Sequence, residues 1–375
     1  MGPTPSLRTN YFNTLQLIEG QGREDLTVVH FKPSQTPTIF KEATILMSSI
    51  LRNVPKPGGQ QLDYSVCIQF LLIHLSCLLA LWTGVSAFAV FICLALYVVR
   101  MFAITAGFHR LLSHRAYRTG RLFQFILAFI GTASYQKGPL WWSSHHRRHH
   151  LYADTENDLH SPLTRTLWRS QVGWFLSSES LPTDARLIPN LIRYPELRFL
   201  DRFYQLPPVL LAVSTFLLGA ALKRYVPGLG TSGPQLLVGG FFIGTVLLYH
   251  GTFTVNSLAH IFGKRRYATD DNSRNNLFVA VITLGEGWHN NHHYYPSSER
   301  QGFYWWEVDI AHCVLRVLSW LGVVWDLREP PEHILSLSAS LTPEIDSSVK
   351  GEVSEVRPAL LRFSPVKESL LGIAS

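Results

Sequence analysis

The sequence predicts an all-α integral membrane protein with four transmembrane helices in two hairpins and a cytoplasmic helical cap. Three observations predict this fold class: four long apolar runs, very short loops within each pair of runs, and an uneven distribution of lysine and arginine. Of the 375 residues, 47% are apolar, which suits a chain that is partly embedded in lipid.

The four apolar runs are each long enough to cross a bilayer, which takes about 20 residues in a helix. The predicted spans are 64–82, 85–106, 206–222 and 236–255. A fifth run, 122–135, is shorter and predicts an interfacial or buried helix.

Loop lengths and charges orient these spans. Only WTGVS at 82–86 separates the first two spans, and the loop 223–235 between the last two is short and rich in Gly and Pro. The two loops carry only Lys223 and Arg224, whereas basic residues are plentiful in 1–60, 108–205 and 256–375. The positive-inside rule therefore places both termini and the central loop in the cytoplasm.

The remaining segments divide the chain into three parts. We expect a cytoplasmic N-terminal segment over 1–60, a membrane domain over 61–333 and a polar C-terminal tail over 334–375. The tail is rich in Ser, Glu and Pro, a composition typical of mobile segments. The net charge of +7 favours anionic membrane lipid as a partner. No basic helix or stacking motif accompanies it, so nucleic acid is not an expected partner.

Nine histidines in four clusters follow the apolar runs, all on the predicted cytoplasmic side. On a helix, residues at i, i+3 and i+4 share one face, so each HxxHH motif can bring its three rings together. Neutral imidazole is the commonest side-chain metal ligand. The nine are His109, His114, His146, His149, His150, His260, His289, His292 and His293.

The number of imidazoles predicts two metal ions at one site, because nine exceed what one ion needs. Imidazole suits zinc, iron, copper or nickel. Iron is favoured because an apolar membrane site offers C–H bonds, whose attack needs activated O2, and zinc has no redox chemistry.

Carboxylates flank two of the clusters. Asp154, Glu156 and Asp158 follow the second cluster, and Glu286 precedes the fourth. Because a metal-bound histidine normally donates its other N–H to such a group, we expect these four to orient the ligands. The alternative is that they are solvated charges or helix caps. His160 ends the same acidic run and is a further candidate for this outer role.

At these residues the chain resembles the membrane fatty acyl desaturase family, in its stearoyl-CoA desaturase-like group. The last of the strings below is most similar to bacterial delta-9 desaturases that act on acyl-CoA or acyl lipid. The resemblance runs from about residue 64 to 328. It rests on HRLLSH at 109–114, HHRRHHLYADTENDLHSP at 145–162, NSLAH at 256–260 and GEGWHNNHHYYPSSERQGFYWWEVD at 285–309.

The resemblance implies a diiron centre of two Fe²⁺ on the nine histidines, with a water held by Asn256. It also implies a narrow kinked tunnel for an acyl chain, for which Trp142 and Phe253 are candidate walls. Arg147 and Arg148 are candidates for contact with the polar head group. Ordinary packing and solvent contact are the alternatives for these four side chains.

Two departures from the family bear on the partners. Ser144 and His145 replace the Arg-Asp pair that the animal acyl-CoA enzymes use on CoA. No HPGG haem-binding motif occurs, so no fused cytochrome b5 domain is expected. Electrons would then come from a separate ferredoxin or cytochrome b5 type protein with its reductase.

The implied reaction is the O2-dependent insertion of a cis double bond, at delta-9, into a long saturated acyl thioester or acyl lipid. The bacterial inner membrane is the expected location, or the endoplasmic reticulum in a eukaryote. One alternative is a fatty acyl or sterol hydroxylase with similar histidine clusters. A non-enzymatic membrane metal-binding protein is another, and it predicts polar ligands along the middle of the spans.

Overall fold

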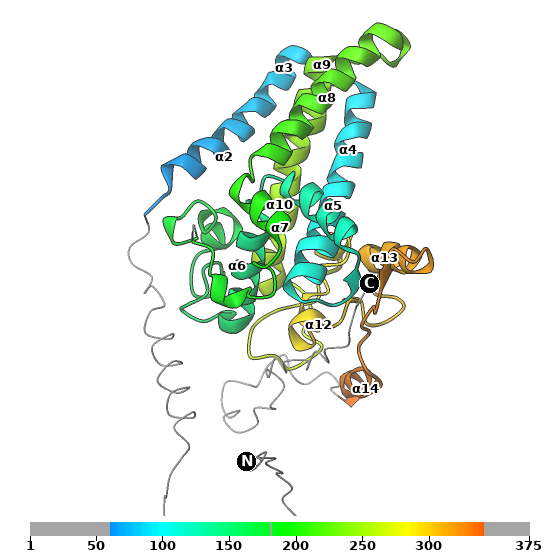
Figure 1. Ribbon diagram of the computed structural model, residues 1–375. Helices are drawn as coiled ribbons and strands as arrows, with labels where there is room; N and C mark the ends of the chain where they lie inside the picture. The colour runs from blue at the N-terminus through cyan, green and yellow to red at the C-terminus, as the bar shows by residue number, and fades with distance from the viewer. Residues whose placement is uncertain (1–60, 181, 341–375) are drawn as a thin grey trace, which may run out of the picture. The chain divides into compact units, whose positions relative to one another are not determined.

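The computed structural model describes residues 61–180 and 182–340, which are mostly helical (Figure 1). Four helical stretches are long and apolar enough to cross a membrane, which confirms the four predicted spans as helices. They cover Tyr64–Thr83, Ala87–Ser113, Leu206–Tyr225 and Gly233–His260. The predicted segment 1–60 and positions 341–375 of the predicted tail lie outside the described residues.

The first span is built from α2 (Tyr64–Ser76), η1 (Cys77–Leu79) and α3 (Ala80–Thr83). Asp63 begins it, because its carboxylate accepts the backbone N–H of Val66 at 2.8 Å. The chain reverses at Gly84, whose φ of 66° suits a residue without a Cβ. Ser86 then caps α4 (Ala87–Phe102) by accepting the N–H of Ala89.

The second span runs further than its hydropathy predicts. Beyond α4 the helix continues as a π-helix, η2 (Ala103–Ser113), and all eleven of its residues are buried. The sequence becomes polar at His109 and Arg110, but the helical backbone continues past these residues to Ser113. A π-helix pairs residues five apart, and the N–H of His114 donates to the carbonyl of His109 at 3.1 Å. This winding brings these two histidines to one side of the helix.

The third span is α8 (Leu206–Tyr225), with Pro207 and Pro208 in its first turn, where a missing N–H costs nothing. After η6 (Pro227–Leu229), the fourth span combines α9, η7, α10 and η8. These cover Gly233–Gln235, Leu236–Ile243, Gly244–Ser257 and Leu258–His260. The span therefore ends at His260, five residues beyond the predicted 255.

Small residues let the second and fourth spans approach closely. A Cβ at Gly239 would lie 3.1 Å from the Cβ of Ala89, and one at Gly240 would lie 3.0 Å from Ile92. In a membrane, where helices gain little from the hydrophobic effect, such close backbone packing is what holds spans together.

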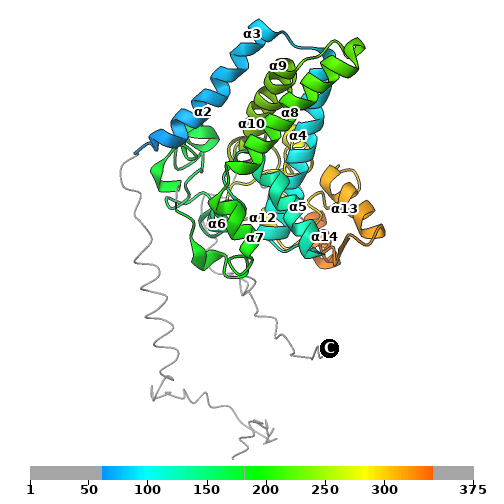
Figure 2. The same ribbon diagram turned by 45° about the horizontal axis from the view of Figure 1, so that its top comes forward.

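The other elements are short. Helices α6 and α12 lie at the same end of the spans in both views (Figures 1 and 2). Strands β1 (Arg118–Thr119) and β2 (Val324–Trp325) pair antiparallel. The helices are α5 (Arg121–Thr132), α6 (Pro139–Tyr152), η3 (Arg169–Gly173), η4 (Ser178–Ser180), η5 (Ala185–Leu187), α7 (Pro195–Arg202), α11 (Leu277–Ile282), α12 (His289–Tyr294), α13 (Ile310–Trp320) and α14 (Glu332–Ser340).

Candidate metal centre

The structure gathers all nine predicted histidines into two groups. Within each group, one ring nitrogen from every member lies within 4.8 Å of the others. The five-histidine group holds His109, His114, His146, His150 and His292. The four-histidine group holds His149, His260, His289 and His293.

Each HxxHH motif contributes to both groups. In α6, the rings of His146 and His150 have centroids 4.7 Å apart and share the five-histidine group. The centroid of His149 is 6.4 Å from that of His146, and this ring belongs to the four-histidine group. In α12 the single His292 joins the five-histidine group while its two partners join the other. The sequence predicted that the three rings of each motif lie on one face and come together. In the structure the three rings are split between the two neighbouring histidine groups.

The ε nitrogens converge within each group. The Nε2 atoms of His114 and His146 are 2.6 Å apart, and those of His260 and His289 are 3.0 Å apart. The Nε2 atom of His293 is buried and has no hydrogen-bond partner within the described residues. Leaving a buried polar atom without a partner is costly. A metal ion would satisfy these lone pairs, so the residues present fit two bound ions.

Carboxylates hold the opposite nitrogen of four rings, one of them in the five-histidine group. Glu286 contacts the Nδ1 of His109. In the four-histidine group, the Nδ1 atoms of His149, His260 and His293 lie 3.1, 2.9 and 2.7 Å from Asp158, Asp154 and Asp271, respectively. A carboxylate on Nδ1 keeps the proton there and leaves the Nε2 lone pair free for a metal.

Two carboxylates differ from the sequence expectation. Glu156 is exposed, and among the described residues the structure does not bring it to any of the nine histidines. Its backbone carbonyl accepts a bond from Arg165. Asp271 was not among the predicted residues, yet it contacts His293. The only signal for it is a pair of aspartates in a polar loop, of which Asp270 is exposed.

Burial keeps most of the centre uncharged. Burial first, and then the neighbouring imidazoles, hold the pKa of His146, His150 and His292 well below 6.5. Burial alone would raise the pKa of Asp158, but the charges of His149 and His160 outweigh it and leave this pKa below its usual range. Neutral imidazoles beside ionised carboxylates are the protonation states that bind a divalent ion.

Arg147 joins α6 to the end of the second span. Its Nε donates to the carbonyl of Ser113 and its Nη2 to that of Leu112, both at 2.8 Å. Its Nη1 donates to the carbonyl of Leu187 and the side chain of Asn190. These bonds satisfy carbonyls at the end of η2 and fix the relative positions of His114 and His146. The guanidinium predicted to meet the head group is therefore occupied within the protein, whereas Arg148 keeps a buried Nε without a partner in the described part of the chain.

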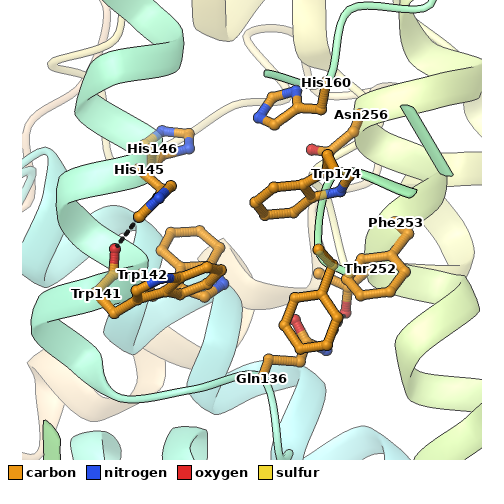
Figure 3. A pocket seen from close by; sticks show the side chains of 11 residues that line it. Gln136, Trp141, Trp142, His145, His146, His160, Trp174, Thr252, Phe253 and Asn256 are labelled. Atoms are coloured by element: carbon orange, nitrogen blue, oxygen red, sulfur yellow. Dashed lines mark hydrogen bonds between the residues drawn. The ribbon is translucent and has the colours of Figure 1, made fainter. Parts of the chain in front are cut away.

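Beside the five-histidine group lies a cavity of about 40 Å³ that is lined by both aromatic and polar side chains (Figure 3). Trp142 forms one wall and stacks on His146 with centroids 5.2 Å apart. Phe253 and Asn256 face it from α10. A hydrogen bond of 3.1 Å joins Gln136 to Thr252. The lining residues are Gln136, Trp141, Trp142, His145, His146, His160, Trp174, Phe175, Thr252, Phe253 and Asn256.

His145 lies in this wall and is bonded through one of its ring nitrogens. Its Nδ1 lies 2.9 Å from the carbonyl of Trp141, and its ring stacks on the indole of that residue at 4.3 Å. Burial lowers its pKa to about 4, so the ring is neutral at pH 7. It lies outside both histidine groups.

A buried ionic network supports the five-histidine group. Arg110 is 1% exposed and donates to Asp309 at 2.9 Å and to Glu286 at 3.3 Å. Glu286 in turn contacts His109. Sequence reasoning missed this arginine, although a basic residue next to a ligand at the end of an apolar run was a visible signal.

The comparisons with known proteins agree with this centre. A family model described as fatty acid desaturase matches residues 85–320. The sn-1 stearoyl-lipid 9-desaturase of Synechocystis sp. is 35% identical over 78% of this chain and 88% of its own. The enzyme of that name from Anabaena variabilis is 34% identical over 72% of this chain and 94% of its own. An acyl-CoA C20 Delta5-desaturase of Anemone leveillei is 34% identical over 69% of this chain and 80% of its own. The chain therefore belongs to the fatty acid desaturase family.

Proposed function

We propose that this protein inserts a cis double bond into a long saturated acyl chain by O2-dependent desaturation. The observation that carries the proposal is a cavity, walled in part by five Trp and Phe rings, whose lining includes His146, a member of the five-histidine group. No Asp, Glu, Lys or Arg side chain lines this cavity, so its walls hold no such charge that would oppose a hydrocarbon chain. The cavity therefore supports a hydrocarbon substrate next to a redox metal centre.

We propose that the nine histidines hold two ferrous ions, one in each group. Asn256 would hold a water that completes the four-histidine group. Bound there, iron would supply the activation of O2 and the removal of hydrogen from unactivated carbon. Glu286, Asp154, Asp158 and Asp271 keep their histidines in the Nδ1–H tautomer, so that Nε2 faces the ion.

The cavity walls give the reaction its position along the chain. Methylene groups are chemically alike, so selection among them depends on how far the chain can enter and where it bends. Trp142, held against His146 by stacking, fixes one wall, and the buried Phe253 fixes the other. We propose these two side chains as the walls nearest the reacting carbons.

The reaction balances only with a separate electron donor. Two C–H bonds on adjacent carbons break and a C=C bond forms, which releases two protons and two electrons. O2 takes these together with two electrons and two protons from outside and leaves as two waters. The proposed donor is a one-electron protein of the ferredoxin or cytochrome b5 type, served by a reductase.

The substrate and its position follow the named relatives. Two relatives are called 9-desaturases and act on stearoyl lipid by name, and another acts on acyl-CoA. We propose position 9 of an acyl chain carried by a lipid or a thioester. The engaged, buried His145 supports the lipid, because it cannot turn outward to a CoA phosphate without losing its bond to Trp141.

We further propose the membrane topology of the sequence analysis: two hairpins, cytoplasmic termini, a cytoplasmic cap and the centre on the cytoplasmic side. Segment 1–60, domain 61–333 and tail 334–375 remain the proposed division. The charge distribution supports it. The first residues of the tail, up to Ser340, belong to α14.

The test is expression in a host that makes no unsaturated fatty acids, followed by mass spectrometry of its lipids. We expect a new cis-9 monoene with the full chain, none with His149→Ala, and an unchanged level with His333→Ala, an exposed histidine on α14. A product heavier by one oxygen would assign a hydroxylase instead. The proposal would be contradicted if the protein restored growth of the host without changing its lipids. It would also be contradicted if the protein held two irons and was given an electron donor but made no product.

A further inference from the structure

The short helix α11 presents an apolar face without a protein partner. Leu277, Phe278 and Val281 are 60%, 64% and 52% exposed, and the nearby Phe262 is 57% exposed. The side chain of Asn276, which begins α11, donates to the carbonyl of Phe262 at 3.1 Å, so the loop and the helix are adjacent. We call Phe262, Leu277, Phe278 and Val281 the α11 face. Such contiguous exposed apolar side chains mark an interaction surface.

The end of α11 contacts the second span at membrane depth. The hydroxyl of Tyr97 donates to the carbonyl of Ile282 at 2.7 Å. Tyr97 lies about 15 Å along the span from its start at Ala87. The hydrocarbon core of a bilayer is about 30 Å thick. Leu94 and Val98, next to Tyr97 on this span, are 57% and 48% exposed, as side chains that face lipid would be. The end of α11 is therefore bonded to the second span beside exposed apolar side chains.

The backbone at the end of α11 is satisfied internally. The carbonyl of Ala280 accepts the N–H of Gly285, and that of Leu284 accepts the N–H of Ala311. The carbonyl of Ile282 accepts the hydroxyl hydrogen of Tyr97. In hydrocarbon no water can supply these bonds, so irregular backbone is tolerated there only when protein groups complete it. A helix end facing water would not need a tyrosine for this purpose.

Two basic residues, Lys264 and Arg265, lie near the start of α11. Lys264 pairs by its backbone with Asn275, two residues before the helix, and Lys264 and Arg265 are exposed. Arg266 pairs with Glu307. The guanidinium of Arg265 donates to the carbonyl of Thr269, and neither Arg265 nor Lys264 forms an ion pair within the described residues. A cationic rim beside an apolar face matches the order of anionic head groups and acyl chains in a lipid leaflet.

We propose that α11 is a membrane-inserted element whose face lies among lipid acyl chains, with Lys264 and Arg265 at the phosphates of anionic lipid. The chain turns at Gly285, three residues after α11, and leads into Glu286 and His289. The loop before α11 carries Asp271, which contacts His293. Lipid would therefore support both segments that hold the four-histidine group. The proposal rests on the four spans and not on the reaction.

The test measures depth with single nitroxide labels on the full chain in nanodiscs of mixed anionic and zwitterionic lipid. The four native cysteines are replaced, and labels are placed by Phe278→Cys, Val98→Cys and Ser336→Cys. Val98 is the lipid control on α4, and Ser336 is an exposed control on α14. We expect position 278 to collide with O2 and to be shielded from a water-soluble nickel chelate, as position 98 is.

Two results would overturn the proposal. A label at 278 that meets the nickel chelate several-fold more often than the label at 98, and as often as that at 336, would place α11 in water. A label at 98 that is itself open to nickel would remove the lipid surface that α11 extends. When Lys264→Gln and Arg265→Gln are combined, the access of nickel to position 278 should rise in anionic nanodiscs and stay unchanged in zwitterionic ones. If the double variant changes nickel access by the same amount in both kinds of nanodisc, the role of the cationic rim is excluded. No turnover is needed, so failure of the proposed reaction would leave these readings intact.

Discussion

The carboxylate of Asp271 lies 2.7 Å from Nδ1 of His293, and the Nε2 of the same ring is buried without a partner in the described residues. Asp271 therefore keeps the proton of this ring on Nδ1, and the lone pair of Nε2 stays free for a metal ion. Burial would raise the pKa of Asp271, but the charge of His293 lowers it below its usual range, so the carboxylate stays ionised.

Asp271→Asn should therefore weaken iron binding. The amide keeps a hydrogen bond to Nδ1 but removes the charge that makes the ring a good ligand, and losses of outer partners cost about 10- to 100-fold in metal affinity. Iron retained against a chelator measures this. Asp270→Asn, at the exposed neighbouring position, is the matched control and should leave retention unchanged. Equal retention in both variants would exclude the role assigned to Asp271.

Arg147→Ala should act through stability rather than substrate binding. The change removes donors from the carbonyls of Leu112 and Ser113 at the end of η2, and each bond to a charged donor contributes about 1.5–3 kcal/mol. We expect a lower thermal midpoint, while the KM for the acyl substrate changes little. Arg115→Ala, at an exposed position two residues after Ser113, is the control. A raised KM with an unchanged midpoint would restore the head-group role predicted from the sequence.

Trp142→Phe should change where the double bond forms. The smaller ring recedes from the cavity beside His146, so the acyl chain can shift along the wall. We expect a mixture of positional isomers with unchanged iron content, read by mass spectrometry of the product lipids. Trp305→Phe, at a side chain that is 85% exposed, should leave the isomer pattern intact. A single unshifted isomer from Trp142→Phe would remove this side chain from the tunnel.

Acid should destabilise the metal-free protein from about pH 6.5 downward. Burial and neighbouring imidazoles lower the pKa of His146, His150, His289 and His292 in the fold. The unfolded chain then binds more protons below 6.5, so the folded state loses up to about 1.4 kcal/mol per pH unit for each ring. His149 has the opposite sign, because Asp158 raises its pKa despite burial, but it is one ring against these four and against His114 and His293, whose pKa values are also lowered.

The thermal midpoint of the metal-free protein between pH 7.5 and 5 measures this loss. Iron should be released over the same range, because protons compete for the ligands. A midpoint that stays constant or rises on acidification would contradict the neutral centre.

Hydropathy predicted the spans but not where two of them end. The second and fourth spans continue to Ser113 and His260 because a helical backbone persists after the side chains become polar. Spacing identified the histidines and could not assign them to groups. Viewed down the helix axis, the last two histidines of an HxxHH motif lie on opposite sides of the first. Which of them joins a given histidine group depends on the neighbouring helices.

The roles of two residues could not be predicted from local sequence. Asp271 sits in a polar loop 22 residues before His293, and only the fold brings them together. Arg147 resembles a solvent-facing cation in its motif, but its targets are backbone carbonyls more than thirty residues away, which no sequence pattern marks. In both cases the missing information is a long-range contact between a charged side chain and another segment.

The number of iron ions per chain tests the central claim most directly. The full-length protein would be purified from cells supplied with both iron and zinc, and its metals counted by elemental analysis. Two groups of buried imidazoles predict two irons per chain and little zinc. One metal per chain, or zinc in place of iron, would contradict the diiron centre and with it the proposed reaction.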